Sequence, residues 1–308
     1  MKPRMSFLSG LIIAVLLLSS VAYADESSML GRIFSLRLSG GGRLFTVGDL
    51  NTSLESWAQT LPSRSYDSIS KVLNFGRWSM TWEIELRFDL SKKLAVGIAV
   101  SNPLGQTKQI EFPLYDPASN DPVSVGSFTT DASIDVRAPI WISGYYTQSL
   151  SRKTNLLFHV GIGYYSGRMR ESLDSEYFDS WHRSAWQTEW KSAFGFHGGV
   201  GFEYVLTTRF SFIMDTRLRR AVLTDFPATM DLDNNMVPTG FYFDESGTLY
   251  LARWDEDGPF GAGTQEFYVW ATAPNGRVGG MFGASSQGKA VLDLSGLSFT
   301  FGIRIALF

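Results

Sequence analysis

Apolar and polar residues alternate strictly at the end of this chain, in "LSGLSFTFGIRIALF". One side of that segment is apolar from Leu297 to Leu307, while the other carries small, polar or charged residues such as Thr300 and Arg304. A period of two is typical of a β-strand with one apolar face. The segment "MTWEIELRFDL" repeats the pattern, with Glu83, Glu85 and Arg87 on its polar side. Alternating segments of about ten residues are the signature of transmembrane barrel strands.

Eight such segments are found along the chain, and the connections between them alternate in length. The predicted strands cover residues 30–40, 77–90, 93–103, 131–148, 155–166, 194–206, 209–222 and 290–308. Tight turns of a few residues follow the second, fourth and sixth strands, whereas the other connections are long: about 41–76, 104–130, 167–193 and 223–289. Short turns on one side and long loops on the other are typical of outer-membrane barrels.

The fold class predicted from this pattern is all-β: a closed antiparallel transmembrane barrel of eight strands with long extracellular loops. Lipid cannot hydrogen-bond an open sheet edge, so the last strand must pair with the first. The final strand is therefore expected to pair with "IFSLRL" near the N-terminus. Phe308 is one residue out of the apolar register, so either a bulge restores it or it points to the periplasmic mouth.

The N-terminus has the pattern of a secretory signal peptide. Lys2 and Arg4 precede the apolar run "LIIAVLLL", and Ala22-Tyr23-Ala24 fits the small-x-small cleavage rule. The apolar run is too short to span a bilayer comfortably as an anchor. We expect residues 1–24 to be a cleaved signal peptide and residues 25–308 to be one outer-membrane barrel domain.

Composition narrows the class of protein further. The chain has 308 residues, a formal net charge of −3 and no cysteine, so neither a disulfide-stapled secreted domain nor a lipoprotein anchored at a cysteine fits. The sequence also lacks the basic patch that a nucleic-acid partner would need. Its 30 glycines and 14% aromatic residues favour strands with close backbone contacts over helices.

The polar faces of the predicted strands give a set of charged residues that point into the barrel. An eight-stranded barrel is just wide enough to be filled by side chains, and buried charges persist only when paired. Acids and bases are closely balanced, so we expect an interlocked network that fills the lumen rather than a proton or solute path. The predicted network consists of Arg37, Glu83, Glu85, Arg87, Asp135, Arg137, Glu203, Asp215, Arg217 and Arg304, together with His159 and His197. Gly97, Gly161, Gly163, Gly199 and Gly201 are expected to leave room for these long side chains.

With its signal peptide, strand pattern, loop asymmetry and terminal "SFTFGIRIALF", the chain resembles the small bacterial outer-membrane barrels of the OmpA-transmembrane, OmpX and OmpW type. The resemblance implies a Gram-negative cell envelope, contact with outer-membrane lipid and lipopolysaccharide, insertion by the barrel assembly machinery, and a monomer. It implies no cofactor and no metal. Members of this class include anchors, adhesins, small-solute channels and a few lipid A enzymes. No peptidoglycan-binding domain follows the barrel, so cell-wall anchoring is not implied.

The first and third long loops contain amphipathic and aromatic segments. In the first, Leu50, Leu54, Trp57 and Leu61 share one helical face behind a cap at Asp49 or Asn51, which predicts packing on the barrel rim. The third is rich in aromatic residues that we assign to an interfacial girdle, the alternative being a carbohydrate or partner surface. These residues are Tyr177, Phe178, Trp181, Trp186 and Trp190. His182 lies near Asp179 and Ser184, but proximity in a loop does not establish a catalytic site.

The fourth loop is the longest, and we expect it to form β-structure above the membrane. Asp231, Asp233 and Asn235 have calcium-like spacing, but Met236 and Tyr242 stand where an EF-hand needs Gly and Glu. The segment "GFYFDESGTLYLARW" is predicted to be a hairpin turning at residues 244–247, followed by a strand at "QEFYVWA". If this hairpin crossed the bilayer, the barrel would have ten strands.

The function expected from the sequence is that of a non-enzymatic outer-membrane protein with a structural or surface-interaction role through its loops. The first alternative is a narrow, porin-like channel for small and possibly hydrophobic solutes, as in OmpW. The second alternative is a lipid A-modifying enzyme, in which His182 would be required.

Overall fold

The computed structural model describes residues 34–48, 50–51, 78–115, 124–177, 180–234, 241–254, 267–273 and 285–307. The predicted signal peptide, most of the first long loop and Phe308 lie outside these residues. The described part of the chain is almost entirely β-strand, and none of its helices has the length and hydropathy to cross a membrane.

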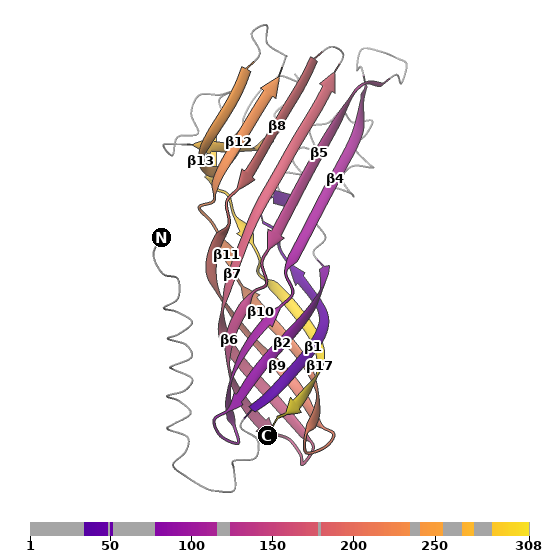
Figure 1. The fold of residues 1–308 in the computed structure, drawn as a ribbon, viewed down its shortest axis with the longest axis vertical. Coiled ribbons are helices and arrows are strands. Elements are labelled where there is room, and N and C mark those ends of the chain that lie inside the picture. Colours follow the sequence, from indigo (N-terminus) through magenta and orange to yellow (C-terminus); the bar gives the residue numbers. More distant parts are fainter. Residues whose placement is uncertain are drawn as a thin grey trace.

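Eight antiparallel strands close into a barrel in the lower half of Figure 1, as the alternating pattern predicted. They are β1 (Phe34–Phe45), β2 (Trp78–Asp89), β3 (Leu94–Ser101), β6 (Ile140–Ser149), β7 (Thr154–Tyr177), β9 (Lys191–Val205), β10 (Phe210–Arg220) and β17 (Gly296–Ala306). Each strand pairs with the next, and β17 returns to pair with β1 through partners such as Leu36 and Ile305. The ten-stranded alternative is therefore wrong.

A second part of the same sheet rises from one side of the barrel (Figure 1). The upper half of β7 continues beyond the barrel and pairs with β5 (Ser124–Val136) on one edge and β8 (Ser180–Thr188) on the other. The outer sheet is completed by β4 (Leu104–Tyr115), β12 (Pro227–Asn234), β13 (Phe241–Trp254), β14 (Phe267–Ala273) and β15 (Ser285–Lys289). Two short strands, β11 (Val222–Leu223) and β16 (Leu292–Asp293), pair with each other. In the sequence, each of them stands between a barrel strand and a strand of the outer sheet.

This outer sheet corrects two sequence predictions. The segment expected to be a hairpin at residues 244–247 is one continuous strand, β13, because each half has a different partner: residues 241–248 pair with β12 and residues 248–254 with β14. The third long loop is mostly strand, formed by the end of β7 and by β8. The strand predicted at "QEFYVWA" is confirmed as β14.

The single strand predicted over residues 131–148 is two strands, β5 and β6, separated by residues 137–139. Pro139 has no N–H to give to a ladder, which favours a break at this point. On β5 the buried apolar residues are even-numbered: Ala132, Ile134 and Val136. On β6 the buried apolar residue Trp141 is odd-numbered. The break therefore shifts the alternation by one residue, which exchanges the two faces of the strand.

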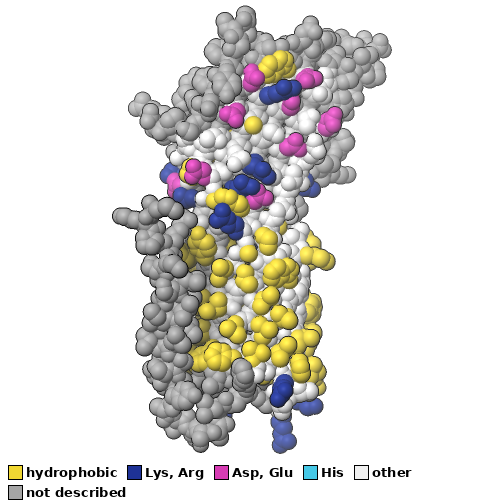
Figure 2. Space-filling model, viewed as in Figure 1, with side chains coloured by type: hydrophobic (Ala, Val, Ile, Leu, Met, Phe, Trp, Pro, Cys, Tyr) yellow, Lys and Arg dark blue, Asp and Glu magenta, His cyan; other side chains and the backbone are white. Residues whose placement is uncertain are grey.

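Large apolar side chains cover the outer wall of the barrel in a belt, visible as the yellow area of Figure 2. Every barrel strand contributes exposed apolar residues, including Leu38, Ile84, Leu94, Ile140, Val160, Phe196, Phe212 and Phe301. An exposed apolar area of this extent marks a surface made to contact another apolar phase. The turns at residues 90–93, 150–153 and 206–209 connect neighbouring strands at the end of the barrel farthest from the outer sheet (Figure 1).

Above the polar interior, buried apolar side chains from several segments form a core between the barrel and the inner face of the outer sheet. Leu50, Leu223, Phe226 and Leu292 are fully buried there, and Met169 joins them from β7. Leu50 begins the segment predicted to pack on the rim, and its burial agrees with that prediction. The rest of that segment, including Leu54, Trp57 and Leu61, lies outside the described residues.

Candidate functional site

The barrel interior holds a network of charged side chains that join strands far apart in sequence. Arg217 on β10 meets Glu83 on β2 through two bonds, Nη1 to Oε2 at 2.9 Å and Nη2 to Oε1 at 3.2 Å. Arg37 on β1 lies 3.2 Å from Asp215 and 3.7 Å from Glu85. All five side chains are almost completely buried. Burial on this scale requires that each charge be compensated, and here every one of the five has an opposite charge within ion-pair distance.

Neutral polar groups and histidines extend this network. His159 Nε2 lies 2.9 Å from Asp215, and Tyr145 donates to Glu85 at 2.8 Å. His197 Nε2 lies 2.8 Å from Ser143 Oγ. Ser143, Tyr145 and His197 are all buried, and Ser143 is only 1% exposed. A serine beside a histidine is one part of a nucleophilic site, but a buried hydroxyl cannot meet a substrate, so this contact is best understood as part of the packing.

A further group of charges lies on the lower part of the interior, nearer the short turns. Arg304 forms an ion pair with Glu203, to which Asn155 also donates at 3.0 Å. Arg87 contacts Asp89 at 3.0 Å and donates to Thr147 at 3.2 Å. The charges are therefore compensated at this level of the barrel too.

Four glycines make room for the network, as the sequence indicated. A Cβ at Gly97 would overlap the Glu85 carboxylate. Added at Gly161 or Gly199, it would lie 2.6 Å from the ring of His197 or His159, respectively. At Gly201 it would lie 3.1 Å from Asp215. Gly163 makes room instead for the ring of Tyr165, in the apolar core above the network.

Two of the ten residues assigned to the lumen from sequence lie elsewhere. Asp135 is partly exposed on the outer face of β5, where it pairs with Arg168 at 2.9 Å. Arg137 is exposed and lies over the ring of Trp190. Both were assigned inward on the assumption of one continuous strand, and the break at residues 137–139 turns them outward. The structure brings the other eight together inside the barrel with His159 and His197.

Trp141, Ser143 and Tyr145 were not predicted to be interior residues, although they occupy inward positions of β6. They carry no charge, so the only signal for them was the alternation itself, which places residues 141, 143 and 145 on the inward face whether or not the strand is continuous with β5. The aromatic girdle assigned to residues 177–190 also needs correction. Trp186 is 6% exposed on the inner face of the outer sheet and donates to Glu171 at 3.1 Å. Phe178 and Asp179, and the side chains of Tyr177 and His182, lie outside the described part of the chain.

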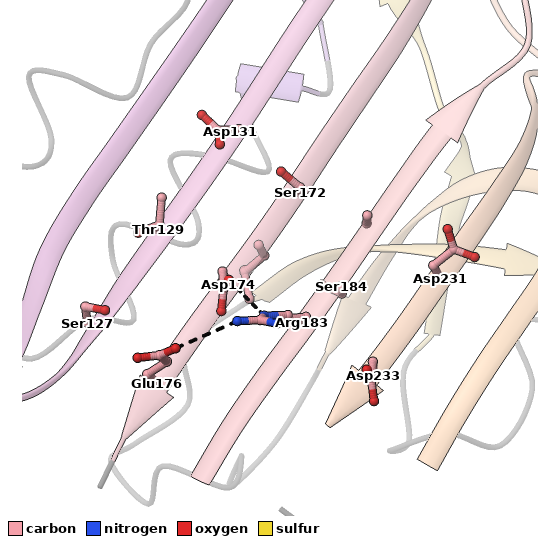
Figure 3. Close-up of a pocket in the computed structure, with 12 residues that line it drawn as sticks. Ser127, Thr129, Asp131, Ser172, Asp174, Glu176, Arg183, Ser184, Asp231 and Asp233 are labelled. Atoms are coloured by element: carbon pink, nitrogen blue, oxygen red, sulfur yellow. Dashed lines mark hydrogen bonds and ion pairs between the residues drawn. The ribbon is translucent and has the colours of Figure 1, made fainter. Parts of the chain in front are cut away.

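The outer sheet carries an open groove on its outward face, shown in Figure 3. Its volume is about 460 Å³, and it runs across β5, β7, β8 and β12. The groove is polar and largely acidic, lined by Ser127, Thr129, Asp131, Ser172, Asp174, Glu176, Arg183, Ser184, Asp231 and Asp233. Arg183 lies 3.0 Å from Asp174 and 3.8 Å from Glu176, so part of this negative charge is neutralised within the sheet.

Asp231 and Asp233 have calcium-like spacing in the sequence, but their backbone does not have the geometry of a calcium-binding loop. Both residues belong to the extended strand β12, whereas an EF-hand needs a tight loop. Asn235 lies outside the described residues. Among the described residues, no group of three or more acidic, histidine or cysteine side chains is arranged to hold a metal ion.

No protein-family model and no curated protein matches this chain. Among solved structures, it is similar to a FadL homologue of Pseudomonas aeruginosa, with 8% sequence identity over 94% of each chain and a TM-score of 0.22. At that identity and TM-score the likeness carries no argument about function.

Proposed function

We propose that this chain is an integral outer-membrane β-barrel protein whose barrel serves as an anchor and whose outer sheet is the working surface. The observation that carries the proposal is the combination of an apolar belt outside the barrel with a lumen filled by the chain's own ion pairs. In outer-membrane barrels, a belt of exposed apolar side chains around the wall contacts lipid. A lumen occupied by paired arginines and carboxylates leaves little room for a solute path.

The interior favours the anchoring role over the channel alternative for a second reason. The apolar core formed by Leu50, Leu223, Phe226 and Leu292 lies above the charged layer, at the end from which the outer sheet rises. A solute moving along the barrel axis would have to displace both layers. We therefore rank the narrow channel second and expect no catalytic activity.

The orientation follows from the loop lengths. Outer-membrane barrels place short turns in the periplasm and long connections outside. The turns at residues 90–93, 150–153 and 206–209 are then periplasmic, and the sheet that contains β4, β5, β8, β12 and β13 stands on the cell surface. The polar groove of Figure 3 becomes the surface available to partners outside the cell.

Location and orientation can be tested by single-cysteine labelling, because the chain contains no cysteine. Gln187 is exposed on β8, and Arg152 is exposed in a short turn. In intact cells, a membrane-impermeant maleimide should label Gln187→Cys, and it should label Arg152→Cys only after the outer membrane is permeabilised. The reverse pattern would contradict the orientation, and recovery of the chain in the soluble fraction would contradict the location.

Planar-bilayer recording separates the anchor from the channel. The folded wild-type chain should insert without producing stepwise conductance, since ion pairs and apolar residues block its axis. Insertion is verified in parallel by the heat-dependent shift in electrophoretic mobility that folded barrels show. Reproducible single-channel steps from inserted protein would overturn the anchor role in favour of the channel.

A further inference from the structure

The outward face of β7 changes character along its length. Phe158 and Ile162 are exposed within the apolar belt, and Tyr164, 45% exposed, marks its upper edge. The next outward positions that are accessible are Arg168 and Arg170. Four residues of strand span about 13 Å, so the first of these arginines lies about that far along β7 from the upper edge of the belt. Figure 2 shows basic side chains gathered directly above the yellow area.

Trp190, in the link between β8 and β9, holds two arginines at this level. The guanidinium carbon of Arg137 lies 4.2 Å from the centre of a Trp190 ring, and that of Arg168 lies 4.9 Å away. Contacts of this kind between arginine and an aromatic face are favourable and orient the guanidinium plane. Tryptophan itself prefers the membrane interface, where one side of the ring meets apolar groups and the other meets water.

Strand pairing between β5 and β7 fixes the other contacts of this cluster. Asp135 is opposite Arg168 and Ser133 is opposite Arg170. Arg168 Nε lies 2.9 Å from Asp135, while Arg170 donates through Nε to Ser133 at 3.0 Å and lies 3.5 Å from Asp135 through Nη2. Two arginines thus pair with one carboxylate, while Arg137 shares the Trp190 side chain with Arg168. Each guanidinium has five N–H donors, and these contacts use only one or two of them.

Among the described residues of this face, basic side chains outnumber acidic ones just above the apolar belt. Higher on the same face, Arg183 is paired with Asp174 and Glu176, and acidic residues outnumber basic ones in the groove. An anion approaching from water would meet mainly carboxylates first. An anion carried at the surface of the surrounding leaflet would meet Arg137, Arg168 and Arg170 directly.

We infer that Arg137, Arg168 and Arg170, positioned by Trp190 and Asp135, form a binding site for a phosphate group of lipopolysaccharide in the leaflet around the barrel. Arginine is the residue best suited to bind phosphate through several parallel N–H donors. The headgroup layer lies within several ångströms of the hydrocarbon edge, which long arginine side chains can span. The inference rests on the proposed outer-membrane location, because lipopolysaccharide is found there. It goes further by naming the residues that bind the phosphate group.

The test uses the full mature chain, folded in a non-ionic detergent, with purified diphosphorylated lipid A as the probe. Binding is measured by native mass spectrometry as the fraction of barrel that retains one lipid A. The test variant, Arg137→Gln with Arg170→Gln, keeps the Arg168–Asp135 pair and so leaves the sheet contact intact. We expect its affinity to fall about tenfold or more, because each basic residue near a lipid surface contributes severalfold.

Arg183→Gln is the matched control, since it removes an arginine from the same face at a greater distance from the belt. It should bind lipid A as the wild type does. Dephosphorylated lipid A should bind the wild type as weakly as the diphosphorylated form binds the double variant. That comparison needs no mutation and stays informative if the double variant fails to fold.

Three results would overturn the inference: unchanged affinity in the folded double variant, an equal loss in Arg183→Gln, or equal binding of dephosphorylated lipid A. Displacement of lipid A by millimolar inorganic phosphate would also overturn it, since the site would then bind free phosphate. The measurement is made in detergent, so it does not depend on where the chain resides in the cell. Failure of the proposed location would show in the cysteine labelling instead.

Discussion

Arg217 on β10 and Glu83 on β2 form a two-bond ion pair across the barrel, with both side chains only 5% exposed. The two residues are 134 positions apart in the chain, and their strands do not pair with one another. The contact therefore crosses the lumen rather than running along its wall. It joins strands that are separated by β1 and β17 in the wall of the barrel, and its side chains occupy part of the lumen.

Removal of one partner of this pair should be strongly destabilising. Glu83→Gln leaves the Arg217 guanidinium buried without the carboxylate that neutralises much of its charge. In comparable buried pairs this lowers the free energy of unfolding by about 3–5 kcal/mol. The free energy of unfolding is measured by urea titration of the barrel in lipid vesicles, followed by tryptophan fluorescence. Glu83→Gln combined with Arg217→Met should recover much of the loss, since no unpaired charge remains. A single-variant cost below about 1 kcal/mol would contradict the assignment of this pair to a water-free interior.

The exposed pair in the outer groove should behave differently. Arg183 and Asp174 lie 3.0 Å apart, but their side chains are 57% and 46% exposed. Water and salt screen such a pair, and its contribution to stability is about 0.2–1 kcal/mol. Arg183→Ala is therefore expected to change the unfolding free energy by less than about 1 kcal/mol in the same titration. A loss as large as that of Glu83→Gln would mean that the groove is closed to solvent.

Two adjacent glycines on β9 offer a matched pair of substitutions. At Gly199 an added methyl group would overlap the Thr216 carbonyl oxygen and press on the ring of His159, whereas at Gly198 its nearest contacts are ordinary, at 3.5 and 3.6 Å. Overpacking of this kind costs about 1–3 kcal/mol. Gly199→Ala should therefore lower stability by that amount, while Gly198→Ala should leave it nearly unchanged. Equal effects would show that the interior can shift to accept the methyl group.

Asp225, between β11 and β12, should titrate below the ordinary range of an aspartate. Lys289 donates to its carboxylate, and this hydrogen bond lowers the pKa of Asp225. Because the folded pKa is lowered, the stabilising contribution is present above the unfolded value of about 3.9 and is lost as the pH falls through the folded value. NMR titration should give a pKa that returns to the ordinary range in Lys289→Met. An unchanged pKa in that variant would contradict the contact.

Asp225 also has a backbone φ of 60°, in the left-handed region. Aspartate tolerates this conformation better than β-branched residues do, and glycine adopts it without a steric penalty. Asp225→Gly should consequently be better tolerated than Asp225→Val, with a difference of about 1–2 kcal/mol in unfolding free energy. The same urea titration measures both variants, and a reversed order would contradict the assigned conformation.

The barrel and its interior could be predicted because their signal is local. Glu83, Glu85 and Arg87 alternate with exposed apolar residues on one strand, and a strand between lipid and a polar lumen imposes that alternation on every barrel segment. The prediction was wrong for Asp135 and Arg137 because alternation only assigns faces within an unbroken strand. A break of three residues at 137–139 reversed the assignment without changing the pattern on either side.

Local residue patterns are enough to show that the strands are apolar on one side, that they join through short turns at one end, and that their charges need partners. Tertiary structure decided which partner each charge has, since Arg217 can reach Glu83 only after the sheet has closed. It also decided that β13 is one strand and that β7 continues into the outer sheet, because both depend on neighbours distant in the chain. Pairing between strands is a long-range property, and the residues at 244–247 and beyond 166 contain no local signal of it.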